Sequence, residues 1–351
     1  MKHVGILTWY FGANYGALAQ SVAMYQTINS LGYEARMINY KPDGYGTIAL
    51  RSNIPPRGKR LLRLKDTING IIKYKNLTAG KYLMETETVT GSDDINKLNL
   101  DCVVLGSDAI FNTDHPLWTP IYYGVGIKLK KITYSPSCEY LPENTILSTE
   151  CIDSLKEMTS ISVRDVNSRK LIEYNAGIIP EITLDPTFLY DFSKFDKNFV
   201  QGDYILIYSF SDWSQYQKQL MSYAKANSLA IVAIGSEVKW ADYSFPSASF
   251  EEWIAAFRNA NMVITDSFHG TVFSLKNNKQ IILCGRKDKQ SKIYSLLEQV
   301  GASLNVYQGE NIDQYLSNNL INYGIVSGNI KYETKKSLFY LTEALKIATS
   351  K

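Results

Sequence analysis

A histidine stands at a junction where an apolar run gives way to a polar turn. His269 lies in the sequence T-D-S-F-H-G, residues 265–270, and is the only histidine in the last two thirds of the chain. A neutral imidazole donates or accepts a proton near pH 7, so His269 is a candidate general acid or base. If a helix begins here, its positive end and first-turn amides favour an anionic ligand. An equally open interpretation makes Asp266 a helix N-cap and His269 a core residue.

Two other charged residues follow apolar runs in the same way. Asp108 ends the sequence G-S-D, and Arg164 lies in S-V-R-D. A carboxylate such as Asp108 accepts a proton from a hydroxyl or caps a helix. The guanidinium of Arg164 suits two parallel hydrogen bonds to a phosphate or carboxylate ligand. It equally suits a structural salt bridge to Asp165 or Glu173.

A glycine-containing loop follows the first apolar run of the chain. The sequence F-G-A-N-Y-G-A, residues 11–17, offers the side chains of Asn14 and Tyr15 and the backbone at Gly16. It is not the G-x-G-x-x-G pattern of a dinucleotide-binding loop, and no acidic residue is placed to bind a ribose. The loop is therefore either a ligand-binding loop or a tight turn between a strand and a helix.

Composition argues against several functional classes. The net charge of +3 over 351 residues is too small to indicate a nucleic-acid-binding protein. The four cysteines lack the spacing of metal, redox or iron–sulfur ligands, so the sequence predicts no metal site. The four are Cys102, Cys138, Cys151 and Cys284. We expect the three that lie in or beside apolar runs to be buried apolar side chains instead.

The elements that position these residues alternate between strand and helix. Residues 4–10 predict a buried strand, residues 18–32 a helix and residues 34–40 a second strand, which together form a βαβ unit. Further strands are predicted at 101–105 and 131–137. Because these strands end in small polar residues, we expect a doubly wound parallel sheet that binds ligands at its carboxyl edge.

The same alternation restarts after a linker at 190–203. Apolar runs at 204–210, 229–235, 262–267 and 280–285 predict strands, with helices between them. The sequence therefore predicts an α/β protein with two Rossmann-like domains, at 1–190 and 191–330, and a cleft between them. A last amphipathic helix, within 331–351, is expected to return to the first domain.

Residues 57–75 form a basic amphipathic segment. It carries seven basic residues against Asp66, with leucines and isoleucines interleaved. Such a segment can lie on an anionic membrane surface, or it can be a solvated helix with its apolar face on the core. The N-terminus does not resemble a signal peptide and no apolar run is long enough to span a membrane. We therefore expect a cytoplasmic protein, associated with the inner face of the membrane if the first interpretation holds.

Six short motifs occur in the order found in one protein family, and the chain resembles the polysaccharide pyruvyl transferase family through them. They span roughly residues 1 to 300 and are N-Y-G-A-L-A-Q (14–20), V-V-L-G-S-D-A-I-F-N (103–112), Y-S-P-S (134–137), I-S-V-R-D (161–165), L-D-P-T (184–187) and V-I-T-D-S-F-H-G-T (263–271).

The resemblance implies a fold and a reaction. The fold is a GT-B-like pair of Rossmann-type domains, with the acceptor side in the first and the donor side in the second. The reaction moves the enolpyruvyl unit of phosphoenolpyruvate onto two hydroxyls of one sugar, giving a cyclic pyruvate ketal and free phosphate. The expected acceptor is a galactose-like hexose of a bacterial surface polysaccharide or of its undecaprenyl-linked precursor. Phosphoenolpyruvate is the donor substrate, and no cofactor, metal or nucleic acid is implied.

The resemblance also implies roles for particular residues. His269 and Asp108 become the catalytic candidates, as the acid or base at the donor and the base at the acceptor. The expected donor-binding residues are Arg164, Ser267, Gly270, Lys292 and Arg286. The expected acceptor-binding residues are Asn14, Tyr15, Gly16 and Ser107.

The chain departs from the family pattern at the donor site. Many relatives read R-L-H-G where this chain reads S-F-H-G, so another cation must serve the phosphate. Lys292 stands where an arginine is common and keeps the charge without the planar fork. Three alternatives remain: a GT-B glycosyltransferase that uses a nucleotide sugar, a non-catalytic glycan-binding or scaffold protein, and a reductase component. An E-x₇-E pattern would favour the first, loss of His269 and Arg164 the second, and cluster-type cysteine spacing the third.

Overall fold

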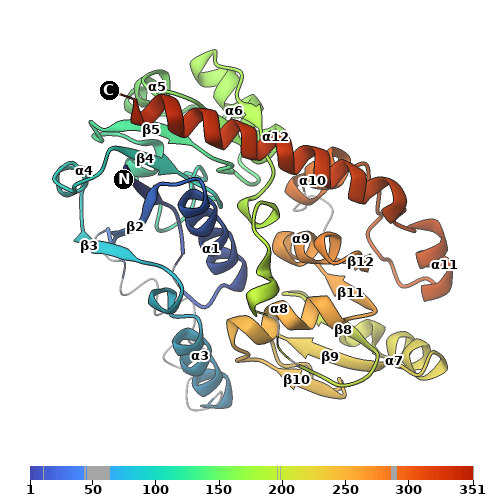
Figure 1. Ribbon diagram of the computed structural model, residues 1–351. Helices are drawn as coiled ribbons and strands as arrows, with labels where there is room; N and C mark the ends of the chain where they lie inside the picture. The colour runs from blue at the N-terminus through green and yellow to red at the C-terminus, as the bar shows by residue number, and fades with distance from the viewer. Residues whose placement is uncertain are drawn as a thin grey trace. The chain divides into compact units, whose positions relative to one another are not determined.

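The chain forms two compact units, each built on a parallel sheet (Figure 1). The structure is a computed structural model that describes residues 1–10, 12–42, 45, 64–195, 197, 199–285 and 291–350. The first unit comprises Met1–Asn53, Thr78–Tyr190 and Lys331–Lys351, and the second comprises Ile54–Leu77 and Asp191–Ile330.

The sheet of the first unit has the strand order β3-β2-β1-β4-β5, with every pair parallel. Its central strands β1 and β4 are rich in valine, isoleucine and leucine, as expected where helices cover both faces. A short pair, β6-β7, follows them. The strands are β1 His3–Leu7, β2 Glu34–Tyr40, β3 Glu85–Val89, β4 Cys102–Leu105, β5 Lys130–Thr133, β6 Ser162–Val163 and β7 Glu181–Ile182.

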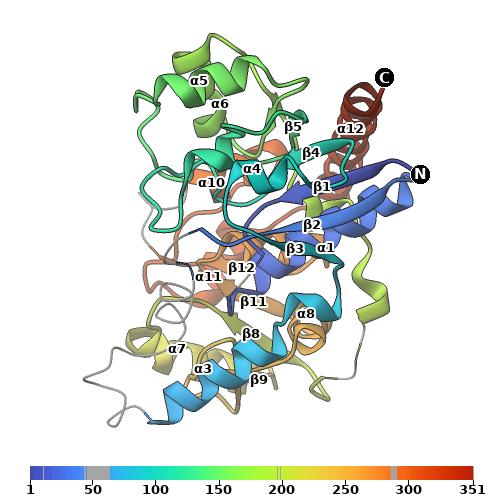
Figure 2. The same ribbon diagram turned by 90° about the vertical axis from the view of Figure 1, so that its left-hand side faces the viewer.

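Side chains along each strand point alternately to the two faces of this sheet, and helices pack against these faces. Leu7, Val103 and Leu105 point to the face where Leu155 and Leu171 pack. α1 lies beside the sheet and contacts β2 (Figure 2). Most of the residues of α1 are buried. The helices of this unit are α1 Tyr15–Ser30, α4 Ser92–Ile95, α5 Thr149–Lys156 and α6 Val166–Ala176.

The second unit repeats the architecture with the order β10-β9-β8-β11-β12, again all parallel. α7 and α11 pack against one face, through residues such as Leu220 and Tyr315. α8 and α9 contact β8, β11 and β12. The strands are β8 Tyr204–Tyr208, β9 Ala230–Ile234, β10 Tyr243–Phe245, β11 Met262–Thr265 and β12 Gln280–Leu283; the helices are α3 Leu64–Asn76, α7 Gln217–Ala226, α8 Phe250–Asn259, α9 Phe268–Lys276, α10 Ser291–Gln299 and α11 Ile312–Asn318.

The last helix, α12 Tyr323–Thr349, has contacts in both units. Asn329 donates to the carbonyl of Val300 in the second unit (3.1 Å). Further along, Tyr340 donates to the carbonyl of Thr133 in the first unit (3.1 Å). The helix begins eight residues before the predicted start at residue 331, because the residues before it continue the helix while packing on the second unit.

The observed α/β fold with parallel sheets in two units confirms the predicted fold class. One part of the predicted boundaries is wrong: the described residues 64–77 belong to the second unit, although the sequence placed them inside a domain at 1–190. The reason is local bonding, since Lys73 donates to the carbonyl of Gly235 (3.1 Å) and Asn76 to that of Ser247 (2.7 Å).

Sequence patterns missed one edge strand of each sheet, β3 and β10, and predicted the other, β5 and β12. β3 reads E-T-E-T-V and is largely exposed, so it has no apolar run to mark it. β10 has three residues and lies at the other sheet's edge. Among the described residues, no helix combines the length and apolar character needed to cross a membrane.

Candidate active site

Each sheet reverses its strand order at one place, and the candidate residues gather there. In the first unit the reversal lies between β1 and β4, and in the second it lies between β8 and β11. At such a switch point the connections leave in opposite directions, so a ligand can reach the carboxyl ends of the strands. Asp108 follows β4, and His269 follows β11.

The turn from β11 into α9 explains why a serine stands before Phe268. Ser267 is the N-cap of α9, with extended backbone, and its hydroxyl accepts a hydrogen bond from the amide of Gly270 at 3.4 Å. A serine satisfies one of the orphan amides of the first helical turn in this way. The alternative that made Asp266 the N-cap is therefore wrong.

His269 occupies the first turn of α9 and is 7% exposed. Its ring meets that of Phe268 edge-on, with 5.3 Å between the ring centroids. The N-terminal end of the helix carries partial positive charge, which stabilises an anion near this imidazole. The position therefore suits a histidine that acts on an anionic substrate.

Gly270 is required by close packing rather than by a special backbone conformation. A Cβ at this position would lie 2.1 Å from Oγ1 of Thr265 and 3.1 Å from Cδ1 of Tyr208. α9 therefore approaches β8 and β11 more closely than any residue with a side chain would allow. This approach fixes the place of His269 relative to the strand ends.

Asp266 holds the loop that follows β8. Its Oδ1 accepts from the amide of Phe210 (2.9 Å), and its Oδ2 accepts from the amide and hydroxyl of Ser211 (2.8 and 2.6 Å). Ser209 joins the same network by accepting from the amide of Ser211 at 3.1 Å. Sequence reasoning singled out none of these β8 residues, although small polar residues directly after a strand were the available signal.

The switch point of the first unit is largely buried. Ser107 is fully buried, and its hydroxyl donates to the carbonyl of Ser135 (2.9 Å) and contacts Oδ2 of Asp185 (3.4 Å). Its own carbonyl accepts from the hydroxyl of Thr8, which follows β1 (2.7 Å). Ser107, predicted to bind acceptor, thus has its polar groups engaged within the unit.

Asp108 is more accessible than Ser107. It is partly buried, has a positive φ of 69°, and accepts from the amide of Ala109 at 2.8 Å through Oδ1. Aspartate tolerates this left-handed conformation better than most residues. Within the described ranges no other residue donates to this carboxylate, so its second oxygen suits a substrate hydroxyl.

Arg164 forms a buried ion pair with Asp185 rather than with Asp165 or Glu173. Nη1 of Arg164 lies 3.3 Å from Oδ2 of Asp185, and the two side chains are 2% and 0% exposed. Asp165 is instead the N-cap of α6, accepting from the amide of Ser168 at 2.8 Å. Both structural partners proposed for Arg164 are therefore wrong. Asp185, in the L-D-P-T motif, is the partner that sequence reasoning missed.

The N-Y-G loop begins α1. Asn14 is exposed and is the N-cap, accepting from the amides of Gly16 (3.0 Å) and Ala17 (3.3 Å). Tyr15 is fully buried. The structure thus gives this loop the capping role, and acceptor binding through Asn14, Tyr15 and Gly16 stays a prediction.

His115 is a second histidine at the first unit's sheet edge, and sequence reasoning did not single it out. Its ring lies against that of Trp9, with 4.0 Å between the centroids, and its Nδ1 accepts from the amide of Leu117 at 3.2 Å. Burial lowers the pKa of His115, while the charges of Glu139 and Asp108 act in the opposite direction. A largely neutral imidazole therefore lies close enough to Asp108 to interact with its charge.

Two predicted donor-binding residues remain, and the structure describes one of them. Lys292 lies at the start of α10 and is half-buried, whereas Arg286 lies outside the described residues. The four cysteines are buried, and burial raises the pKa of Cys102 and of Cys138 to about 12. Over the described ranges, no cluster of histidine, cysteine, aspartate and glutamate side chains has the composition of a metal site.

Comparisons with known proteins agree on a family and a fold. A family model described as polysaccharide pyruvyl transferase matches residues 14–288. No curated protein matches the chain in sequence.

Several solved structures are similar to this chain along nearly its whole length. UDP-GlcNAc 2-epimerase from Neisseria meningitidis, bound to UDP-GlcNAc, has a TM-score of 0.55 at 10% identity and covers 98% of this chain and 99% of its own. S. aureus MnaA, in a co-structure with UDP, has a TM-score of 0.55 at 9% identity, covering 100% and 99%. UDP-GlcNAc 2-epimerase from Methanocaldococcus jannaschii has a TM-score of 0.53 at 11% identity, covering 100% and 93%. At these identities the similarity shows the fold alone, which is GT-B-like as predicted.

Proposed function

Because the chain belongs to the polysaccharide pyruvyl transferase family, we propose that it transfers pyruvate from phosphoenolpyruvate to two hydroxyls of one sugar. The observation that carries the proposal is the extent of the family match. Residues 14–288 include His269, Asp108, Arg164 and the loops after β4, β8 and β11. The family resemblance therefore covers both switch points, where α/β sheets bind their ligands.

The reaction requires proton transfer at carbon and at oxygen. The methylene carbon of phosphoenolpyruvate gains one proton and becomes the methyl group of the ketal. The bond between C2 and the phosphate oxygen breaks, and two acceptor oxygens form bonds to C2. Each acceptor hydroxyl loses its proton, so that one of these protons balances the new methyl group and the other leaves on phosphate. An acid, a base and cationic groups for the donor are the catalytic needs.

In the second unit, His269 serves as the acid that protonates the methylene carbon. Support comes from its place in the first turn of α9, where the helix end stabilises the negative charge of a phosphate or carboxylate. Ser267 and the close approach at Gly270 shape the donor site, while Asp266 holds the β8 loop beside it. Lys292 and Arg286 are the proposed cations for the phosphate, in place of the arginine that many relatives carry before the histidine.

In the first unit, Asp108 serves as the base for the acceptor hydroxyl. Support comes from its partial exposure and from its single described hydrogen bond, to Ala109. Arg164 is proposed to contact the donor, and its ion pair with Asp185 holds the guanidinium in one orientation. We propose a galactose-like hexose as the acceptor, in a bacterial surface polysaccharide or its undecaprenyl-linked precursor, and a cytoplasmic location.

The test is phosphate release from phosphoenolpyruvate with galactose-, glucose- and N-acetylmannosamine-bearing acceptors, followed by mass spectrometry of each acceptor. The expected result is a mass gain equal to pyruvate less one water, with one phosphate released for each ketal formed. UDP-sugars in place of phosphoenolpyruvate provide the control. The melting temperature of the chain is also measured with and without phosphoenolpyruvate. If the chain transfers a sugar from a UDP-sugar, and phosphoenolpyruvate does not raise its melting temperature, the chain is instead a GT-B glycosyltransferase.

A further inference from the structure

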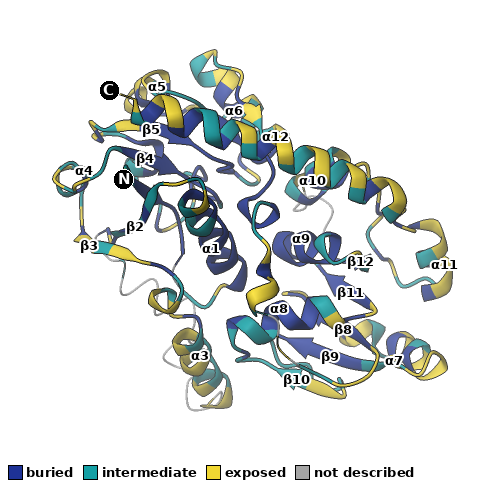
Figure 3. Ribbon diagram, viewed as in Figure 1, coloured by how far each residue is buried: buried dark blue, intermediate teal, exposed yellow. Residues whose placement is uncertain are grey.

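The first unit gathers one aromatic and three titratable side chains at the carboxyl edge of its sheet. β4 is buried at every residue (Figure 3), so the chain can offer side chains to a ligand only beyond the carboxyl end of this strand. The loop after β1 carries Trp9, the loop after β4 carries Asp108 and His115, and the loop after β5 carries Glu139. A ligand bound at this edge would therefore lie among these side chains.

Contacts at the end of β1 place the ring of His115 next to Asp108. The hydroxyl of Thr8 donates to the carbonyl of Ser107 at 2.7 Å, so β1 and β4 are joined just beyond their carboxyl ends. Trp9 and Asp108 are the next residues on the two sides of this bond. The imidazole of His115 packs on the Trp9 indole, with 4.0 Å between the ring centroids. Burial is the larger effect on the pKa of His115 and lowers it, while the charge of Asp108 raises it, which agrees with this placement.

Hydrogen bonds fix the turn that carries His115. The backbone amide of His115 donates to the carbonyl of Asn112 at 3.1 Å, and the carbonyl of His115 accepts from the amide of Trp118 at 2.8 Å. Asn112 is itself buried, and its side-chain amide donates to Oε2 of Glu139 at 3.0 Å. The imidazole is therefore held in place before a ligand binds, which lowers the cost of binding.

The hydrogen bond at Nδ1 decides which ring nitrogen of His115 carries the proton. Nδ1 accepts from the amide of Leu117 at 3.2 Å, so in the neutral imidazole the proton lies on Nε2. Nε2 is therefore a hydrogen-bond donor. Among the described residues no group accepts from it, and His115 is only partly buried. His115 thus offers one donor to a ligand.

The neighbouring carboxylate supplies the complementary acceptor. Asp108 receives one hydrogen bond within the described ranges, from the amide of Ala109 to Oδ1, and is partly buried like His115. A hydroxyl group both donates and accepts, so it can donate to Asp108 while it accepts from Nε2 of His115. A phosphate or carboxylate group would instead be repelled by the charges of Asp108 and Glu139. The pair therefore suits a neutral ligand with hydroxyl groups, such as a sugar.

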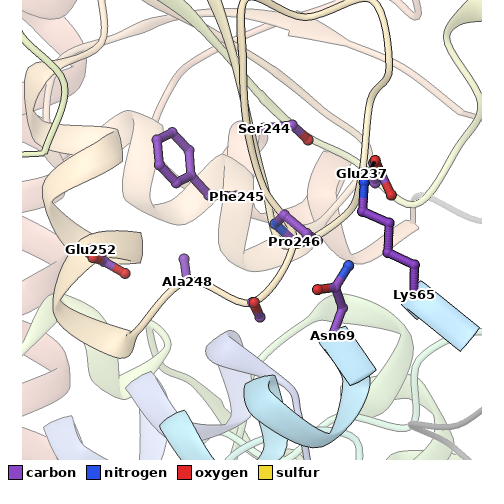
Figure 4. A pocket seen from close by; sticks show the side chains of 9 residues that line it. Lys65, Asn69, Glu237, Ser244, Phe245, Pro246, Ala248 and Glu252 are labelled. Carbon is purple, nitrogen blue, oxygen red and sulfur yellow. Dashed lines mark hydrogen bonds and ion pairs between the residues drawn. The ribbon is translucent and has the colours of Figure 1, made fainter. Parts of the chain in front are cut away.

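The pocket beside helix α3 lies away from the switch point of the second unit. It has a volume of about 350 Å³, and Figure 4 shows Lys65 and Asn69 from α3 beside it with Glu237. Lys65 and Glu237 form an ion pair, and the described lining includes no residue directly after β8 or β11. It is therefore less suited to a reacting hydroxyl than the edge at His115. For α3 itself, the membrane contact predicted for residues 57–75 stays a prediction, because residues 57–63 lie outside the described part of the chain.

We propose that His115 binds the sugar acceptor, with its Nε2–H donating to the hydroxyl whose proton Asp108 removes. The inference rests on the proposed pyruvyl transfer and adds a catalytic contact to it. As the hydroxyl oxygen bonds to C2 of the donor, its O–H bond breaks and the proton moves to the Asp108 carboxylate. His115 keeps its own proton and orients the oxygen, so that the attacking lone pair points away from the imidazole.

Two substitutions test this role because each keeps one half of the imidazole's hydrogen bonding. His115→Asn keeps an acceptor for the Leu117 amide, whereas His115→Gln keeps an N–H donor that reaches the position of Nε2. KM is measured for phosphoenolpyruvate and for the galactose-, glucose- and N-acetylmannosamine-bearing acceptors. His115→Asn should raise the acceptor KM about tenfold, the effect of one lost hydrogen bond, and leave KM for phosphoenolpyruvate unchanged. His115→Gln should raise the acceptor KM by about threefold or less.

Calorimetric titration of the same acceptors without phosphoenolpyruvate separates this contact from the proposed reaction. The unaltered chain should bind one of them, and His115→Asn should bind it about tenfold more weakly. The matched control is His3→Asn, which makes the same change at the amino end of β1 and should bind as the unaltered chain does. Sugar binding that depends on His115, without phosphate release from phosphoenolpyruvate, would support the contact and contradict the reaction.

Three results overturn the inference. The first is that the unaltered chain binds none of these acceptors, and the second is that His115→Asn binds them equally well. The third is that His115→Gln loses as much affinity as His115→Asn, which would show that the turn is disturbed and that the donor at Nε2 is not what matters.

Discussion

The switch points of the two sheets have the same topology but different degrees of burial. At the β1/β4 switch point most polar side chains are enclosed: Ser107, Arg164 and Asp185 are each at most 4% exposed, and Ser107 and Arg164 both contact Asp185, whereas Asp108 is partly buried. At the β8/β11 switch point Ser267 and His269 are 8% and 7% exposed, and Asp266 is partly buried.

This difference separates structural from chemical roles at equivalent places in one fold. A buried ion pair contributes to local structure, because removing one partner leaves an uncompensated charge. A histidine in the first turn of a helix lies beside the partial positive charge of the helix N-terminus, which can stabilise an anionic ligand there. We therefore expect substitutions of the enclosed residues Arg164 and Asp185 to act first on stability, and substitutions of Asp108 and His269 to act first on activity.

The largest expected effect is on turnover at the β8/β11 switch point. His269→Ala should lower kcat for phosphate release by about 10²–10⁴-fold, the usual contribution of a positioned acid or base. The melting temperature should stay close to that of the unaltered chain. His3→Ala, which removes a histidine at the start of β1, is the control and should leave kcat unchanged. Near-normal turnover by His269→Ala would show that His269 is not the acid.

The next effect is on stability at the β1/β4 switch point. Arg164→Met should lower the free energy of unfolding by about 3–5 kcal/mol, because Asp185 keeps a buried charge without its partner. The double variant Arg164→Met with Asp185→Asn should recover much of this loss, as measured by urea unfolding. Arg164→Lys tests the proposed donor contact separately: it should raise KM for phosphoenolpyruvate. An unchanged KM would leave the residue with a structural role alone.

A smaller effect is expected from packing under His269. Gly270→Ala should lower the free energy of unfolding by about 1–3 kcal/mol, because its Cβ would overlap Oγ1 of Thr265. Gly328→Ala in α12 is the matched control, since nothing lies within 4 Å of its Cβ. That change should stabilise the chain slightly, as alanine is the better helix former. Equal stability of both variants would show that α9 does not need its close approach.

The smallest effect is a pH dependence at the β1/β4 switch point. Because burial lowers the pKa of His115 below 6.5, the unfolded chain binds a proton there more readily than the folded chain. Stability should therefore fall as pH drops through the region below 6.5 and be regained as pH rises. His115→Asn should show a shallower acid loss when melting temperatures are compared from about pH 7.5 to about pH 5. Parallel curves for the two proteins would contradict the lowered pKa.

The sequence by itself determined the elements that carry local signals. Continuous apolar runs located the central strands, which are buried on both faces, and apolar residues at helical spacing located most helices. The six motifs identified the family, and the position of His269 after an apolar run placed it at a strand end. Edge strands such as β3 escaped because an exposed strand needs no apolar run.

Only the tertiary structure decided which side chains meet. Arg164 pairs with Asp185, 21 residues away, because β6 and β7 lie side by side; spacing alone pointed to Asp165 and Glu173 instead. The amphipathic pattern of α3 likewise predicted a helix without saying which face turns inward. That choice depends on polar partners from the β9 and β10 region, which a pattern within one segment does not contain.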